Sequence, residues 1–373
     1  MNELQEIFRA SRELQRNGSD AVLATIVNVH GSTYRRPGAR MLINREGRTF
    51  GLISGGCLEG DIFKRAQTVF ETGQPDLISY DTRSADDLLW GFGLGCTGLI
   101  EVLLERIPSA DGGNYLEFLE RAQSARRRCS VATMLTSAPE SGVVRGAHLL
   151  LDQDGTSEIP EMDASLSAGI LAECRAVLAA GATSNSTVTL SSRELNVFIE
   201  AVPIPPRLLI FGAGADAVPL ISFAKELGWS AVIIDNRPAY LNRELFPRAD
   251  GMFLADPGTL PDNVVLEPED LAVVMTHNYH HDLAIVRRLL PSQIHYIGLL
   301  GPKSKSTMLL KALADEGTSP TPEQLARLYT PVGIDIGAES PEEIALAIVS
   351  EMQAAISGRP AGSLRNREGS IHR

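Results

Sequence analysis

The stretch LLIFGAGADAVPL, residues 208–220, runs from an apolar segment through a glycine-rich turn into a segment of helical period. Gly212 and Gly214 occupy the first two positions of a dinucleotide-binding fingerprint, and Ala217 occupies the third, where alanine is allowed. The first glycine permits a tight turn, the second lets a pyrophosphate approach the backbone, and the helix presents unpaired N–H groups to the anion. The stretch predicts the first strand, turn and helix of a Rossmann-like domain.

The rest of the C-terminal half repeats this alternation of apolar runs and helical segments. The runs cover residues 207–211, 230–235, 251–254, 271–276 and 294–298. Such alternation is typical of a doubly wound parallel sheet covered by helices on both faces. The last helix is marked by an N-cap at Ser340, a proline at position 341, a capping-box carboxylate at Glu343 and Gly358 beyond its end.

The N-terminal half has a different pattern, with β-rich runs joined by turns and interrupted by a few helical segments. Three prolines, Pro203, Pro205 and Pro206, form a stiff connector between the halves. We therefore expect an α/β protein with an N-terminal α+β domain, residues 1–204, and a Rossmann-like domain, residues 205–373. Expected strands are 21–29, 39–44, 49–54, 99–104, 130–136, 143–151, 186–191 and 195–202, and expected helices are 57–71, 113–128 and 164–180.

The C-terminal half predicts a nucleotide site, although a tight turn in a fold that has lost its ligand is the alternative. Asp235 ends the strand after the fingerprint, where a carboxylate accepts hydrogen bonds from both ribose hydroxyls. This carboxylate would repel a 2′-phosphate, which favours NAD over NADP, although Arg237 lies nearby. Thr276 and His277 follow another strand and are expected at the same rim of the sheet.

Two neighbouring segments leave alternatives open. His277, His280 and His281 could suggest a metal site, but the segment has no convincing further ligand beyond Asp282 and no HExxH motif. The other interpretation is that His277 faces a ligand at the rim and that His280 and His281 are solvated helix residues. Lys303 and Lys305 follow a further strand and glycine, where they could meet a phosphate or simply begin a solvated helix.

The N-terminal half carries a cysteine in a glycine-rich bend. Gly55 and Gly56 allow a sharp turn, and Cys57 is expected at the start of a helix, where the helix dipole would stabilise a thiolate. The alternative is a small buried residue at a strand–helix junction.

A second cysteine, Cys96, lies among glycines before a strand, which suggests backbone wrapped closely around a ligand. Arg35 and Arg36 lie in a loop and could meet a phosphate or an acidic partner, although a solvated hairpin tip is the more common fate. Cys129 lies directly before an expected strand and Cys174 lies within an expected helix, so both are predicted to be structural residues.

Composition excludes several classes of function. The net charge of −12 opposes binding to nucleic acid, and no apolar run approaches the ~18 residues of a membrane span. The four cysteines are far apart and form no CxxC pair, which argues against a disulfide scaffold. We expect a soluble cytoplasmic protein with free thiols and no membrane or nucleic-acid partner.

The motifs taken together resemble the XdhC/CoxI family, the xanthine dehydrogenase accessory factors. The resemblance extends from about residue 20 to 356 and rests on VHGSTYRRPGARMLI (29–43), GLISGGCLEGDI (51–62), WGFGLGCTGLIEVLLE (90–105), PPRLLIFGAGADAVPL (205–220), VVMTHNYHHD (273–282), YIGLLGPKSK (296–305) and PVGIDIGAESPEEIALAI (331–348). The pairing of GGCLEGDI with a later Rossmann fingerprint is specific.

The resemblance implies a protein that binds the molybdenum cofactor, protects it while a cysteine desulfurase installs its terminal sulfur, and helps insert it into a molybdenum hydroxylase such as xanthine dehydrogenase. It would place Cys57 and its glycines at the cofactor end, as a molybdenum contact or sulfur-handling thiol, and Gly212, Gly214 and Asp235 at a nucleotide end. That end would hold NAD or the nucleotide part of a dinucleotide form of the cofactor.

The family resemblance favours a chaperone over an enzyme, but two enzymatic interpretations remain open. One is an NAD-dependent oxidoreductase in which His277 serves as acid or base, although no substrate-clamping set is evident. The other is a metal hydrolase using His277, His280 and Asp282. A homodimeric state is also left open.

Overall fold

The computed structural model describes residues 3–31, 33–81, 98–109, 115–138, 142–181, 184–190 and 193–368. The chain divides between Ile204 and Pro205 into two compact units. Each unit has its own hydrophobic clusters. None of the described helices is long and apolar enough to cross a membrane.

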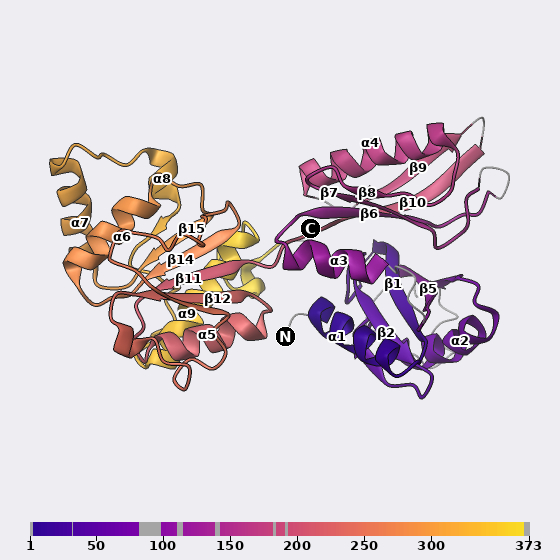
Figure 1. Cartoon of the computed structure of the whole chain (residues 1–373), viewed down its shortest axis with the longest axis horizontal. Coiled ribbons are helices and arrows are strands. Elements are labelled where there is room, and N and C mark those ends of the chain that lie inside the picture. Colours follow the sequence, from indigo (N-terminus) through magenta and orange to yellow (C-terminus); the bar gives the residue numbers. More distant parts are fainter. Residues whose placement is uncertain are drawn as a thin grey trace. The chain divides into compact units, whose positions relative to one another are not determined.

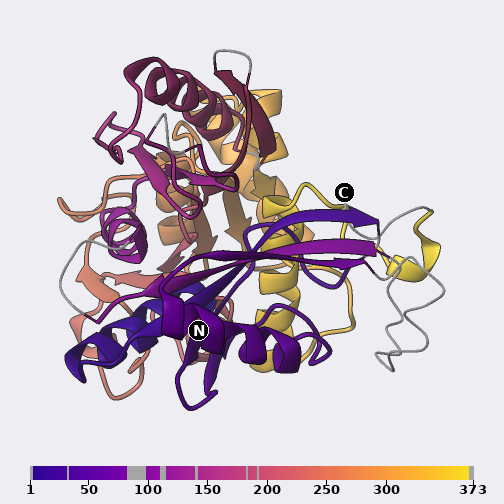
Figure 2. The same ribbon diagram turned by 90° about the vertical axis from the view of Figure 1, so that its right-hand side faces the viewer.

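The first unit begins with an antiparallel sheet, here called sheet A, with strand order β3-β2-β1-β5-β4. Its strands are β1 (Ala21–Gly31), β2 (Arg40–Asn44), β3 (Thr49–Gly51), β4 (Asp76–Asp81) and β5 (Gly98–Ile107). The long pair β1 and β5, drawn in indigo and purple in Figure 2, shifts register between Ile26 and Asn28. Helix α1 (Glu3–Arg16) packs on one face of sheet A and α2 (Glu59–Thr72) on the other.

A second antiparallel sheet, sheet B, follows with strand order β8-β7-β6-β10-β9. Its strands are β6 (Cys129–Met134), β7 (His148–Asp152), β8 (Ser157–Glu158), β9 (Ser184–Leu190) and β10 (Arg193–Val202). Helix α4 (Ala164–Ala180) covers one face of sheet B. Asp163 caps the start of this helix, and Gly181, with a φ of 64°, ends it. The other face shares its apolar cluster with α3 (Tyr115–Ser124) and with β1, β2 and β5 of sheet A.

Polar groups are buried where the two sheets face each other. Arg40 on β2 forms an ion pair with Glu200 on β10, and both side chains are almost fully buried. Glu105 on β5 bonds His148 on β7. Each pair joins a strand of sheet A to a strand of sheet B, so the two sheets are tied together by polar contacts as well as by apolar packing.

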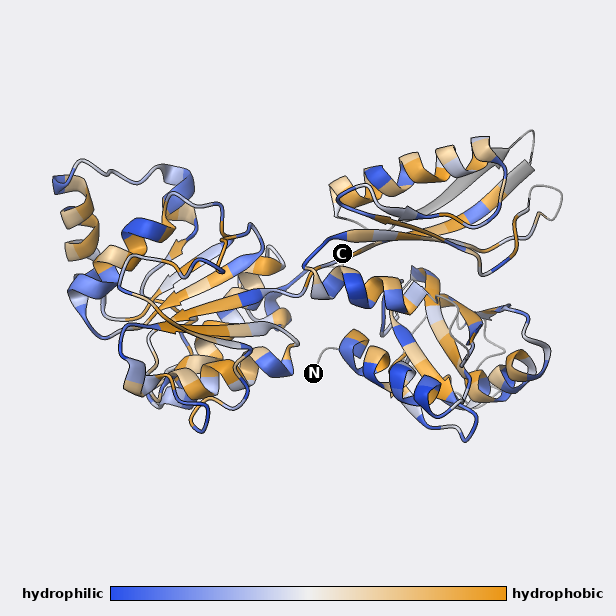
Figure 3. Cartoon of the chain, in the orientation of Figure 1, coloured by the Kyte–Doolittle hydropathy of each residue, from blue (hydrophilic) through white to orange (hydrophobic). Residues whose placement is uncertain are grey.

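The second unit is a six-stranded parallel sheet with strand order β13-β12-β11-β14-β15-β16. One face is covered by α5 (Ala217–Glu226) and α9 (Pro341–Ile356), and the other by α6 (Tyr279–Leu289) and α7 (Lys303–Asp315), as Figure 1 shows. Figure 3 shows β11, β12 and β14 mostly in the orange of hydrophobic residues, as expected for strands buried on both faces. The strands are β11 (Arg207–Phe211), β12 (Ser230–Asp235), β13 (Gly251–Leu254), β14 (Asp270–Val274), β15 (Tyr296–Leu299) and β16 (Leu328–Tyr329).

The helices of this unit are α5 (Ala217–Glu226), α6 (Tyr279–Leu289), α7 (Lys303–Asp315), α8 (Pro322–Ala326) and α9 (Pro341–Ile356), with short 3₁₀ turns at Pro238–Tyr240 and Leu364–Asn366. The capping box predicted for the last helix is present, with Ser340 and Glu343 exchanging hydrogen bonds. The predicted fold class, an α+β half followed by a doubly wound parallel sheet, is confirmed.

Several predicted bounds differ from the structure: the strand predicted to end at residue 54 ends at Gly51, and the helix predicted to end at residue 128 ends at Ser124. Two other differences have a clear cause. The helix predicted from residue 57 begins at Glu59, because the amides of Cys57 and Leu58 donate to the Ser54 hydroxyl in a turn that precedes it. The strand predicted from residue 143 begins at His148, because Val143 pairs only with Ala138 in an isolated bridge and the chain then turns at Gly146.

Candidate functional site

The carboxyl edge of the parallel sheet gathers the residues predicted to bind a nucleotide. Gly212 leaves β11 with a φ of 121°, and its amide donates to the carbonyl of Ile234 on β12. A β-carbon at this position would lie 2.6 Å from the backbone oxygen of Met275, the residue that follows the neighbouring strand β14. Gly212 is therefore required by the close approach of two segments of backbone, whether or not a ligand binds.

Gly214 is constrained differently. A β-carbon there would meet the carboxylate of Asp216, which is the flexible end of a side chain rather than backbone. Asp216 precedes α5, makes no capping bond to that helix, and lies 2.8 Å through Oδ2 from Nε2 of His277. A carboxylate and an imidazole thus pair beside the helix N-terminus where the fingerprint predicts a phosphate.

Asp235 is buried at the end of β12, and both of its carboxylate oxygens are bonded within the unit. Oδ2 accepts from the amide of Ala213 (2.7 Å) and from Nη2 of Arg237 (2.8 Å). Oδ1 accepts from the amide (2.8 Å) and Nε (2.9 Å) of Arg237. Burial alone would raise the pKa of Asp235, but the hydrogen bonds from Arg237 and the Ala213 amide outweigh it and hold the pKa below its ordinary value.

These contacts give Asp235 a part in shaping the fingerprint turn. The Arg237 guanidinium also lies over the ring of Tyr240, 3.9 Å from its centroid. A ribose could reach the carboxylate oxygens only by replacing bonds that Arg237 now makes.

Thr276 and His277 lie on the same rim, as predicted. The Thr276 hydroxyl donates to Oδ1 of Asp282 (2.6 Å), and Lys305 forms an ion pair with the other oxygen of this fully buried carboxylate. Lys305 also donates to the carbonyl of Leu300. In this structure its ammonium group joins the start of α7 to α6, and a phosphate contact by Lys305 stays a prediction.

His277 has a φ of 57°, a left-handed conformation that is costly for a residue other than glycine, and its side chain is largely exposed. The amides of His280 and His281 donate to the Asn278 side chain, which caps α6. Among the described residues no group of three His, Cys, Asp or Glu side chains could hold a metal ion. The metal-hydrolase interpretation has no ligand set in this part of the chain.

In the first unit, Gly55, Gly56 and Cys57 form an exposed loop before α2, and Gly56 has a φ of 105°. Ser54 stabilises the loop, because its hydroxyl accepts hydrogen bonds from the amides of Cys57 and Leu58, both at 3.0 Å. The carboxylate of Glu59 accepts from the amide and hydroxyl of Ser54 and from the amide of Leu58. Cys57 thus precedes the helix, and an acidic group already occupies the helix N-terminus.

The remaining predicted residues are not joined to this loop by any described hydrogen bond or ion pair. Arg35 pairs with Glu3 of α1 (2.6 Å), and Arg36 is exposed. Cys96 lies outside the described residues. Cys129 and Cys174 are buried, and burial raises the pKa of their thiols to about 12 and about 11, as expected for structural cysteines.

Sequence reasoning missed the parts of the site that depend on pairing across the fold. It noted Arg237 only as a nearby charge, and it gave no role to Asp216, although this residue lies inside the fingerprint. Their partners become visible only when the ends of β11, β12 and β14 are brought to one edge.

Comparison with protein-family models gives two matches. Residues 208–352 match the XdhC Rossmann domain, and residues 14–81 match the XdhC and CoxI family. Among curated proteins, the chain is 38% identical over 339 residues to a Bacillus subtilis protein named as a probable xanthine dehydrogenase subunit, covering 89% of this chain and 92% of the relative. It is 23% identical over 346 residues to the molybdenum cofactor insertion chaperone PaoD of Escherichia coli, covering 93% of this chain and 86% of PaoD.

A solved structure has the same fold over almost the whole chain. It is a crystal structure from Bacillus halodurans described as a xanthine dehydrogenase. Its TM-score is 0.77 at 30% identity, and the match covers 98% of each chain.

Proposed function

Because this chain belongs to the XdhC/CoxI family, we propose that it binds the molybdenum cofactor, supports its sulfuration and delivers it to a molybdenum hydroxylase of the xanthine dehydrogenase type. The observation that carries the proposal is the similarity, over 93% of this chain, to a relative named as a molybdenum cofactor insertion chaperone. In this role the protein is a maturation factor rather than an enzyme and acts in the cytoplasm. Its partners are the client hydroxylase and a cysteine desulfurase.

The loop around Cys57 has the chemistry that the cofactor requires. Its thiol is exposed, and the flanking glycines leave open space, because a β-carbon on Gly55 or Gly56 would meet no atom within 4 Å. The cofactor, when bound, supplies a molybdenum centre and its terminal sulfur, both of which suit a soft thiolate partner. We assign Cys57 to contact with that centre or to carrying sulfur, and Ser54 and Glu59 to holding the loop in place.

We assign the nucleotide end to the turn at Gly212 and Gly214 and to the rim that contains Thr276 and His277. NAD and the nucleotide part of a dinucleotide cofactor both carry the pyrophosphate that such a turn accepts. The ion pair of Arg237 with Asp235 weakens the preference for NAD, which depends on an available carboxylate.

An NAD-dependent oxidoreductase is the second candidate function, favoured by the sheet topology alone. His277 would then be its acid or base, but the described partner of this imidazole is Asp216, next to the fingerprint. Steady hydride transfer to a panel of small alcohols and acids by the purified protein would favour this function over the chaperone.

The test is to purify the full chain from a host that makes molybdenum cofactor and to identify the released small molecules by mass spectrometry. We expect molybdopterin or its dinucleotide form in wild-type protein. Replacing Cys57 by Ser keeps the volume of the side chain and removes the soft sulfur, so cofactor content or client activation should fall at least about 10-fold. Cys129→Ser is not a suitable control, because that thiol is buried in the core.

Cys96→Ser, at the other glycine-flanked cysteine, provides the matched comparison and should have the smaller effect. Wild-type cofactor content in Cys57→Ser would show that this thiol has no role in binding. A wild-type protein that carries no molybdopterin would contradict the proposed function as a whole.

A further inference from the structure

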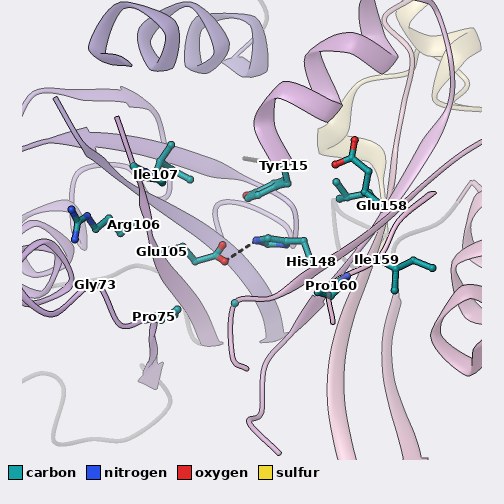
Figure 4. Close-up of a pocket in the computed structure, with 13 residues that line it drawn as sticks. Gly73, Pro75, Glu105, Arg106, Ile107, Tyr115, His148, Glu158, Ile159 and Pro160 are labelled. Carbon is teal, nitrogen blue, oxygen red and sulfur yellow. Dashed lines mark hydrogen bonds and ion pairs between the residues drawn. The ribbon is translucent and has the colours of Figure 1, made fainter. Parts of the chain in front are cut away.

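A cavity of about 410 Å³ lies in the first unit where sheets A and B meet, away from the Cys57 loop (Figure 4). It is lined by β5, β7, β8, the start of α3 and the turn that follows α2. This volume lies within the range of about 300–1,000 Å³ that small-molecule sites occupy. Nothing in the assigned functional residues accounts for it.

A buried carboxylate in the cavity wall lacks one hydrogen-bond partner. Glu105 is only 5% exposed, and its Oε1 lies 2.8 Å from Nε2 of His148, as the dashed line in Figure 4 shows. Nδ1 of that imidazole lies 3.1 Å from the hydroxyl of Thr133. The other oxygen of Glu105, Oε2, has no partner among the described residues. An unpaired buried oxygen is costly, so a donor that reaches Oε2 would be stabilising.

None of the described side chains that line the cavity supplies that donor. Arg106 donates twice to Asp20, and Glu158 at the opposite rim pairs with Arg121. A single water could fill the vacant position, but the cavity is many times larger than the roughly 30 Å³ of one water.

The backbone and one aromatic ring shape the space beside Glu105. A β-carbon on Gly146, which has a φ of 80°, would lie 2.8 Å from Cγ of Pro75 and 3.0 Å from Oε1 of Glu105. Only glycine lets the chain pass this close to the carboxylate. The ring of Tyr115 lies against that of His148, with centroids 3.9 Å apart and ring planes inclined by 35°, so aromatic surface borders the acceptor. Aromatic surface favours a ligand that has a ring of its own.

We propose that this cavity binds the aminopyrimidinone edge of a pterin, with Glu105 as the residue that recognises it. A carboxylate can accept side by side from a ring N–H and the neighbouring exocyclic amine, as it does from the parallel donors of a guanidinium. The terminal torsion of a glutamate is soft, which lets the carboxylate turn toward such a ligand. The inference rests on the proposed function, because the molybdenum cofactor contains a pterin. Cys57 precedes α2, whereas the cavity borders Gly73 at the other end of this helix, about 21 Å away at 1.5 Å per residue. A cofactor whose pterin lies in the cavity therefore leaves Cys57 the sulfur-carrying role.

The test compares two ligands that differ at one group. Pterin carries a 2-amino donor, whereas lumazine carries a 2-oxo acceptor in its place. The full-length wild-type protein should bind pterin about 10- to 100-fold more tightly than lumazine in a fluorescence titration, because the exocyclic donor meets a charged acceptor. Guanosine carries the same edge on a different ring system and serves as the third ligand.

Glu105→Gln should reverse the preference, because the amide gains a donor for the 2-oxo group and keeps an acceptor for His148. Glu120→Gln, at a carboxylate of α3 that pairs with Arg12 and does not line the cavity, should keep the wild-type preference. Equal binding of pterin and lumazine by wild-type protein, no binding of pterin, or tighter binding of guanosine than of pterin would each overturn the inference. The comparison of pterin with lumazine binding by the wild-type protein tests the inference even if Glu105→Gln does not fold.

Cofactor content, measured separately on the same proteins, distinguishes this inference from the function on which it rests. Wild-type protein that retains molybdopterin but does not discriminate pterin from lumazine would refute only the role of the Glu105 cavity. Wild-type protein that retains no molybdopterin would refute the proposed function.

Discussion

At the scale of single residues, the contact between Asp235 and Arg237 decides how the second unit can read a nucleotide. Three of the four hydrogen bonds to the carboxylate come from Arg237. The fourth comes from the Ala213 amide and holds the fingerprint turn. A ligand ribose must therefore compete with an ion pair that is already formed, which lowers the affinity for any nucleotide bound through its ribose hydroxyls.

Removing the Arg237 side chain should relieve this competition. We expect Arg237→Ala to bind NAD about 10-fold more tightly than the wild type, because two hydrogen-bonding positions on a charged acceptor become available. Affinity for NADP should fall, since a guanidinium that could meet a 2′-phosphate is lost and an unpaired carboxylate remains. Isothermal titration with both nucleotides measures the two effects.

A matched control for this variant is Arg248→Ala, because Arg248 also pairs with a carboxylate of the same unit, that of Glu226, but lies elsewhere on the surface. It should leave both affinities unchanged. Weaker NAD binding in Arg237→Ala would contradict the competition model and would mean that Arg237 itself contacts the ligand.

At the scale of elements, the start of α2 links stability to the proposed cofactor loop. Glu59 is the first residue of the helix, and its carboxylate bonds the Ser54 amide and hydroxyl and the Leu58 amide. Burial alone would raise the pKa of Glu59, but the bonds from Ser54 and the helix amides lower it below its ordinary value. The charged form therefore stabilises both the helix start and the turn that carries Cys57.

Because the folded-state pKa of Glu59 is lowered, its stabilisation is present above the ordinary pKa of about 4.3 and is lost as the pH falls through the lower value. We expect Glu59→Gln to lower the free energy of unfolding at pH 7 by about 1 kcal/mol, a cost similar to that of losing a helix cap. The difference from wild type should shrink as the pH falls below about 4. Urea unfolding at several pH values measures it.

Glu342→Gln is the control for this pH series, since Glu342 lies in the first turn of α9 but is not the capping-box residue. It should show a smaller difference at pH 7. A Glu59→Gln deficit that stays constant from pH 7 to pH 3 would contradict the role given to the charge.

Elements with strong local signals could be predicted from the sequence, whereas their pairing could not. The glycine fingerprint, the capping box at Ser340 and the run 164–180 each have a distinct pattern within a few residues, and the structure has them. Strand β4 was not predicted, because DLISYD is short and only one of its six residues is buried. It is held by pairing with β5, which follows a long intervening segment.

For the candidate site too, local positions could be predicted from the sequence but contacts between distant residues could not. The sequence indicated which residues end strands, so Gly212, Asp235, Thr276 and His277 were expected on one rim, and they lie there. It could not indicate that Arg237 would form an ion pair with Asp235. Nor could it indicate that Glu105 and His148, 43 positions apart, would form a hydrogen bond between two sheets. Such contacts are fixed by strand order and register, and no local pattern encodes them.

At the scale of the whole molecule, the two units have separate cores. The apolar clusters of the second unit draw only on residues beyond Pro205. Those of the first unit draw only on residues up to Ile204. Large buried side chains such as Phe8 and Phe198 in the first unit and Phe246 and Tyr296 in the second each lie among neighbours from their own unit.

Fragments 1–204 and 205–373 should therefore each unfold cooperatively, because each contains whole the apolar clusters that its described residues form. Cofactor retention should behave differently. The proposed thiol and pterin contacts belong to the first fragment and the proposed nucleotide contacts to the second, so each fragment should retain molybdenum cofactor at least about 10-fold less well than the whole chain. Circular dichroism melts test the folding, and cofactor content after purification from a molybdenum-cofactor-producing host tests the retention. Full retention by fragment 1–204 would show that the Rossmann-like unit serves another ligand.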